Sequence, residues 1–157
     1  MRYLVRAAAG LLLAASLAIV SCDDPQGFVE PELVRQSIVD LFNFDMDGQQ
    51  QEIYRITVGG DMVHPHLEGK WTFTDPEKPI DIYVVPAASY DPNLLPGEQP
   101  VIRWSSLQDA IVGQQRQTTM HIHPEVGEWV IILYNSLPYV ATSRSRISSE
   151  IDLTYFK

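Results

Sequence analysis

Cysteine is nearly absent from this chain, since Cys22 is the only one in 157 residues. A single cysteine excludes an internal disulfide, and it also excludes a metal site built from several thiolates. We therefore expect packing and hydrogen bonds alone to stabilise the fold.

Basic residues are also scarce, with 11 Lys and Arg against 20 Asp and Glu, for a formal net charge of −9. Arg2 and Arg6 both precede Cys22, so the chain from Cys22 onward carries 9 basic and 20 acidic residues, or −11. An excess of negative charge repels polyanions. This argues against nucleic acid and against an anionic membrane surface as partners.

Long apolar runs are missing outside the N-terminus. The run Ala7–Val20 is apolar apart from Gly10 and Ser16 and follows two arginines. Its 14 residues would rise about 21 Å as a helix, which is shorter than the ~30 Å hydrocarbon core of a bilayer. A positive start followed by a short apolar run is typical of a signal peptide rather than of a membrane-spanning helix.

The residues that come next, Ile19-Val20-Ser21-Cys22, resemble the lipobox of bacterial lipoproteins. The resemblance implies cleavage before Cys22, a diacylglycerol on its thiol and an N-acyl lipid on the new amino group. Two or three acyl chains anchor a protein stably. We thus expect a signal peptide at 1–21, a lipid-anchored tether at 22–36, and a domain exported to the bacterial cell envelope. Asp23 resembles an inner-membrane retention signal of enteric bacteria, but other phyla interpret it differently, so the choice of membrane stays open.

The rest of the chain alternates in steps of two. Residues 67–74 alternate apolar and polar side chains, as a half-buried strand does. A Pro-rich turn at 75–79 and a second alternating run from Ile80 predict a hairpin over 67–85. Similar alternation predicts strands at 54–58 and 147–155.

Residues Trp129–Tyr134 are apolar at every position, which predicts a central strand buried on both faces. Met120 and Ile122 indicate a neighbouring strand, joined to it by a turn at Pro124–Gly127. Several short strands separated by turns predict an all-β fold, an antiparallel, jelly-roll-like β-sandwich over 37–157.

The segment 31–46 fits two structures. Val34, Ile38 and Leu41 follow helical spacing, whereas the alternation of Phe42, Phe44 and Met46 is that of a strand. We favour a strand over about 37–46.

Two runs, Gly69–Val85 and Gly127–Asn135, resemble the pre-peptidase C-terminal domains and the GOLD type of bacterial β-sandwich. The resemblance implies an accessory binding or structural module without an active site. It supplies no catalytic residues, so we do not expect an enzyme. The implied partner is another envelope protein or a surface polymer.

All four histidines fall in two pairs, His64-Pro65-His66 and His121-Ile122-His123. Residues i and i+2 of a strand share a face, and the His121/His123 pair is expected to point outward because Met120 and Ile122 point inward. If the pairs face each other, they form a Zn²⁺ or Cu²⁺ site and the protein is a metal-binding lipoprotein. Otherwise they are solvated surface residues.

The run His121-x-His123-x4-Glu128 also resembles the first metal motif of cupins, which would imply a cupin-like metalloenzyme. Asn135 stands where that motif has a glycine, and no later glycine–histidine motif follows. The cupin-like enzyme is therefore less favoured than either a binding or structural module or a metal-binding lipoprotein.

One long loop, Pro86–Pro100, carries Tyr90, Leu94 and Leu95. Apolar side chains on a long loop indicate either a binding loop or a cap over the end of the core, and we favour the cap.

Overall fold

The computed structural model describes residues 30–73, 80–106, 117–138 and 144–157. The chain divides into a unit of residues 1–30 and a unit Pro31–Lys157, and all the described strands belong to the second unit. The expected signal peptide, Cys22 and most of the expected tether lie outside the described residues, as does the turn at 75–79.

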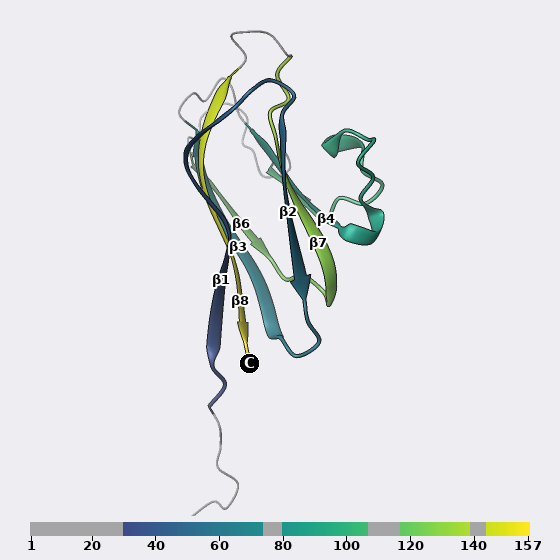
Figure 1. The fold of residues 1–157 in the computed structure, drawn as a ribbon. Helices are drawn as coiled ribbons and strands as arrows, with labels where there is room; N and C mark the ends of the chain where they lie inside the picture. Colours follow the sequence, from purple (N-terminus) through teal and green to yellow (C-terminus); the bar gives the residue numbers. More distant parts are fainter. Residues whose placement is uncertain (1–29, 74–79, 107–116, 139–143) are drawn as a thin grey trace, which may run out of the picture. The chain divides into compact units, whose positions relative to one another are not determined.

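Two four-stranded sheets make up this second unit (Figure 1). Every strand pairing in the described segments is antiparallel. The first sheet has the order β1-β8-β3-β6, with strands β1 (Leu33–Met46), β8 (Ser145–Phe156), β3 (Val63–Phe73) and β6 (Gln117–Ile122). The second has the order β2-β7-β4-β5, with β2 (Gln51–Val58), β7 (Gly127–Tyr134), β4 (Asp81–Pro86) and β5 (Trp104–Ser105). Two short 3₁₀ helices, η1 (Ala87–Ser89) and η2 (Pro96–Glu98), lie between β4 and β5.

This strand order is that of an eight-stranded jelly roll, in which consecutive strands alternate between the two sheets except at β4 and β5. The predicted all-β antiparallel sandwich is confirmed. Both predicted local pairings are wrong, however. β3 and β4 do not form a hairpin, and β6 is not the neighbour of β7, because each pair is divided between the sheets. A period of two reports which face of a strand is buried, and it carries no information on which strand pairs with it.

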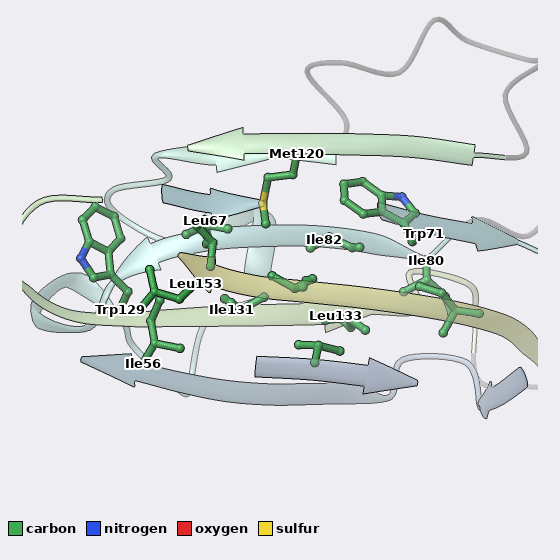
Figure 2. Close-up of a cluster of buried hydrophobic side chains, with 14 of the residues drawn as sticks. Ile56, Leu67, Trp71, Ile80, Ile82, Met120, Trp129, Ile131, Leu133 and Leu153 are labelled. Atoms are coloured by element: carbon green, nitrogen blue, oxygen red, sulfur yellow. The ribbon is translucent and has the colours of Figure 1, made fainter. Parts of the chain in front are cut away.

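The core fills the space between the sheets (Figure 2). Leu67, Trp71, Met120 and Leu153 come from the first sheet, and Ile56, Ile82, Ile131 and Leu133 come from the second. All but Ile56 are almost completely inaccessible to solvent. The expected central strand is confirmed, because β7 lies between β2 and β4 and is buried from Trp129 to Tyr134.

The segment 31–46 is a strand and not a helix, and β1 begins at Leu33, so residues 33–36, expected in the tether, pair with β8. A register shift between Leu41 and Phe44 interrupts this strand, and Asn43 there has a φ of 50°. The bulge turns Phe42 out to solvent, at 84% exposure, whereas Phe44 and Met46 pack on the core.

Candidate functional site

The outer side of the β2-β7-β4-β5 sheet is covered by residues 87–103, which we call the covering segment (Figure 1). Tyr83, Val85, Val130 and Ile132 point outward from β4 and β7 and form a second, smaller apolar cluster. Ala87, Tyr90 and Ile102 pack against this cluster. The covering segment therefore explains why β4 and β7 are apolar on both faces.

The buried side chain of Gln99 organises this segment. Its Oε1 accepts a hydrogen bond from the Asp91 backbone N–H at 2.8 Å, and its Nε2 donates to the Asp91 carbonyl at 2.8 Å. Tyr90, which precedes Asp91, is half-buried. The Cζ atom of the Arg55 guanidinium lies over its ring, 5.6 Å from the ring centroid. Leu94 is half-buried and Leu95 is 50% exposed. Of the three residues expected on this loop, Tyr90 packs against the second apolar cluster on the outer side of the sheet and not over the end of the core. Leu95 is the one of the three with a half-exposed side chain.

The outer side of the β1-β8-β3-β6 sheet has a different character, with charged side chains in ordered ion pairs. We call it the charged face and define it by Arg35, Glu68, Lys70, Glu150 and Asp152, which line a depression of about 110 Å³. Arg35 pairs with Asp152 and, at 3.3 Å, with Glu150, while the Lys70 ammonium lies 2.7 Å from the same Glu150.

The strand register sets this pattern, since Lys70 of β3 lies opposite Glu150 of β8 and Glu68 lies opposite Asp152. The hydrogen bond from Lys70 holds the pKa of the Glu150 carboxyl below its usual value, and the bond to Asp152 raises the pKa of the Arg35 guanidinium. Side chains of opposite charge on neighbouring strands are therefore paired across this exposed side of the sheet.

Three of the four histidines meet at the β6 side of the charged face. The His66 ring stacks against His123 with 4.8 Å between centroids and against His121 with 5.5 Å. We call these three residues the histidine cluster. His64 has a φ of 52° where the β3–β8 register shifts, and within the described segments no ring contact joins it to the others. The predicted outward direction of His121 and His123 is confirmed, since both are exposed while Met120 is buried.

In the described part of the chain, no three His, Cys, Asp or Glu side chains already stand in position to hold a metal ion. The cupin-like set is also split. His121 and His123 lie on the outer side of the first sheet, whereas Glu128 is exposed on β7, opposite Thr57 of β2 in the second sheet. These three side chains therefore do not converge, and the motif match reflects spacing alone.

A larger depression, of about 430 Å³, lies at one end of the second sheet and was not expected from the sequence. Arg55, Arg103, Glu125, Glu128 and Trp129 line it. The Trp129 indole N–H donates to the Glu125 carbonyl at 2.9 Å, which fixes the ring there. Arg55 comes from β2, Glu128 and Trp129 from β7, Arg103 from a loop and Glu125 from a turn, so no local sequence pattern predicts this depression.

Two titratable side chains on β4 are buried outside these surfaces. Burial raises the pKa of the Asp81 carboxyl, although a hydrogen bond with Ser136 partly opposes the effect. Burial also raises the pKa of Tyr83 to about 12, with a further contribution from the nearby Asp81 charge. Tyr83 belongs to the second apolar cluster, on the covered outer side of the second sheet.

Comparison with protein-family models and with curated proteins gives no match. The resemblances to lipoproteins and to the two sandwich families therefore stay predictions from the sequence. Within the described residues, no helix has the length and apolarity needed to cross a bilayer. The fold and geometry define the class: a jelly-roll β-sandwich with one outer side covered by residues 87–103 and one outer side that is charged and, among the described residues, uncovered.

Proposed function

We propose that this protein is a lipid-anchored lipoprotein of the bacterial cell envelope whose sandwich binds another envelope protein or a surface polymer without catalysing a reaction. The anchor rests on the signal-like residues 1–21 and on Cys22. The binding role rests on one observation, the contrast between the covered outer side of the second sheet and the charged outer side of the first, which no segment covers within the part of the chain that the structure describes.

The charged face is suited to a polar partner. Its ion pairs present both signs side by side, and side chains already held in place lose less conformational entropy when a partner docks. A partner whose charges are complementary to this surface is recognised with high specificity. The charges contribute less to the affinity of the complex. Arg35 and Lys70 are two of the nine Lys and Arg residues after Cys22.

Exposed apolar side chains at the end of the sandwich where β1 begins support a position close to a membrane. Leu33 and Val63 both lie opposite Phe156 at the start of β1 and β3 and the end of β8. All three are exposed, at 62%, 51% and 37%. Leu33 is eleven positions after Cys22, and a chain of eleven steps reaches at most about 40 Å. A lipid on Cys22 would keep the sandwich within that distance of the bilayer and raise its effective concentration for other envelope components.

The anchor is tested with labelled palmitate in cells that express the full chain. We expect incorporation in the parent protein, loss of incorporation in Cys22→Ala, and a shift of that variant out of the membrane fraction. A parent protein without label, or a Cys22→Ala variant that still carries it, contradicts the anchor.

The binding face is tested by crosslinking in isolated membranes. Lys70→Glu reverses a charge on the charged face, and Arg144→Glu is its matched control, because both side chains are about 60% exposed and each makes one surface ion pair. We expect the crosslinked products of the parent to disappear in Lys70→Glu and to persist in Arg144→Glu. Equal crosslinking in all three proteins contradicts a partner on the charged face.

A further inference from the structure

We propose that His66, His121 and His123 together bind one divalent transition-metal ion, Zn²⁺ or Cu²⁺, on the outer side of the β1-β8-β3-β6 sheet. This inference does not rest on the lipid anchor or on the partner of the charged face. It concerns three of the four histidines and excludes His64.

The two strands bring the three Cα atoms into an arrangement suited to one ion. Leu67 of β3 pairs with Ile122, the last residue of β6, and His66 and His123 come directly beyond this terminal pair with their rings stacked. Directly opposed Cβ atoms of an antiparallel pair are about 4.5–5.5 Å apart. His121 and His123 are two residues apart on one strand, about 7 Å, and point to the same side. Two candidate ligands that follow one strand and one from its neighbour thus lie close together on one side of the sheet.

The distances between the rings match those that a shared ion requires. Zinc lies about 2.0–2.1 Å from an imidazole nitrogen, hence about 3.2 Å from the ring centre, and two rings at a tetrahedral angle then have centres about 5 Å apart. The centroids of His66 and its two neighbours are 4.8 Å and 5.5 Å apart. The third separation, between His121 and His123, is adjustable because both side chains are exposed.

The ring planes still have to turn before the ion is held. They are only 17° and 21° from parallel, so their nitrogen lone pairs point side by side and do not converge. In this arrangement the described residues contain no preformed metal site. Turning an imidazole about χ2 meets a low barrier, and exposed side chains change rotamer within nanoseconds. Among the described residues, no hydrogen bond or ion pair restrains these three rings.

The surroundings favour a cation. Glu68 lies directly opposite His121 in the strand register and is exposed on the same side of the sheet, so its carboxylate is a candidate for a fourth ligand. Asp152 lies opposite Glu68 on the other side, on β8. The Thr154 hydroxyl donates to the His66 carbonyl at 3.3 Å, which ties the backbone of His66 to β8 and leaves its ring free. Imidazole and carboxylate ligands together suit Zn²⁺ and Cu²⁺.

His64 provides the matched control. It lies on the same strand as His66 and has the same chemistry, but the register shift between Val63 and His66 and its left-handed backbone separate it from the cluster. A site that depends on geometry must distinguish His64 from His66. Adventitious binding by surface imidazoles would not.

The experiment uses the full chain, purified in detergent without a polyhistidine tag and stripped of metal with a chelator. Zn²⁺ and Cu²⁺ are titrated separately at neutral pH, the metal content is measured after gel filtration, and the Cu²⁺ form is examined by electron paramagnetic resonance. We expect one ion per chain and nitrogen hyperfine coupling from three imidazoles. Each of His66→Ala, His121→Ala and His123→Ala is expected to lose at least about 10–100-fold in affinity, since changes to groups that merely support a metal ligand already have that effect. His64→Ala is expected to bind as the parent does.

Circular dichroism of each variant confirms that the fold is retained, as expected for changes at the sheet surface. Absence of near-stoichiometric Zn²⁺ and Cu²⁺ binding overturns the proposal. So does an equal loss of affinity in His64→Ala and His66→Ala, which would indicate dispersed surface binding. The same titration on Cys22→Ala separates this proposal from the anchor, because the histidine cluster is intact in that variant.

Discussion

Gly69 of β3 lies opposite Met120 of β6 on the inner side of the sheet, and a Cβ on residue 69 would lie 3.1 Å from the Met120 Cε. The same Cβ would lie 3.1 Å from Cγ1 of Ile151 on β8. Carbon contacts prefer about 3.5–4.0 Å, so the missing side chain at this position is what lets Met120 and Ile151 fill the core between β6 and β8.

Gly69→Val should lower the free energy of unfolding by about 1–3 kcal/mol, the usual cost of forcing extra methyl groups into a packed core. Met120→Ala alone should cost about 2–5 kcal/mol, because Met120 is fully buried and a cavity remains. In the double variant the valine occupies part of that cavity, so the combined loss should be smaller than the sum. Urea denaturation of the four proteins measures this coupling, and strictly additive losses would show that the two positions do not share space.

Ser149 of β8 has its hydroxyl buried, at 3% exposure, without a hydrogen-bond partner among the described residues. Removing an unsatisfied buried hydroxyl should raise the free energy of unfolding, by about 1 kcal/mol for Ser149→Ala. The neighbouring Ser148 is the control, because its Oγ accepts a hydrogen bond from the Asn43 backbone N–H at 3.0 Å. Ser148→Ala should cost about 0.5–1 kcal/mol. Thermal unfolding that ranks the two variants in the opposite order would contradict this assignment of partners.

Tyr90 and Leu95 separate the capping role of the covering segment from a binding role. Tyr90→Ala should lower the free energy of unfolding by about 2 kcal/mol, because it removes apolar area from the second cluster and the ring beneath Arg55. Leu95→Ala should stay within about 0.5 kcal/mol, since half of that side chain is exposed. Denaturation and limited proteolysis of both variants provide the measurement. If Tyr90→Ala left stability unchanged and proteolysis of residues 87–103 unaltered, the cap would not be needed.

Asp81 and Asp45 should affect stability with opposite dependence on pH. Burial raises the pKa of Asp81 in the folded state, so the folded protein binds the extra proton and loses stability as the pH rises through that raised pKa. Asp81→Asn should therefore be more stable than the parent at pH 7, and this advantage should vanish below about pH 3.9, where the unfolded carboxyl is also protonated.

Asp45 is the counterpart, because the hydrogen bond from Arg146 lowers its pKa. The stability from this pair is present above the unfolded pKa and is lost as the pH falls through the folded one. Asp45→Asn should thus be less stable than the parent at pH 7 and equal to it in acid. Melting temperatures of both variants from pH 3 to pH 8 test the signs, and parallel curves for the two would contradict the assignment.

Most of the strands could be predicted from alternation, because a half-buried strand must place apolar side chains at every second position. The sequence predicted the buried side of β3 and β8 and the central place of β7. Phe42 broke the rule, since the bulge at Asn43 adds a residue and reverses the faces beyond it. The prediction of which strands pair with each other was the larger error, since β3 does not pair with β4 and β6 does not pair with β7. In a jelly roll, strands adjacent in sequence are mostly in different sheets, so neighbours along the chain are poor guides to neighbours in space.

For the candidate sites too, the direction of a side chain could be predicted from the sequence, whereas its neighbours on other strands could not. That His121 and His123 point outward follows from Met120 and the period of a strand, but their approach to His66 depends on the β3–β6 pairing. Likewise, Lys70 and Glu150 are 80 positions apart, and only the register of β3 on β8 makes them an ion pair.

The sequence by itself determined what each strand hides and what it exposes, because burial depends on the local order of apolar and polar side chains. It also determined that the chain cannot form an internal disulfide and that it has few positively charged side chains. Tertiary structure alone decided which strands are neighbours, which outer side is covered by residues 87–103, and which three of the four histidines meet. These are properties of long-range pairing, set by the packing of two sheets around one core, and no local pattern encodes them.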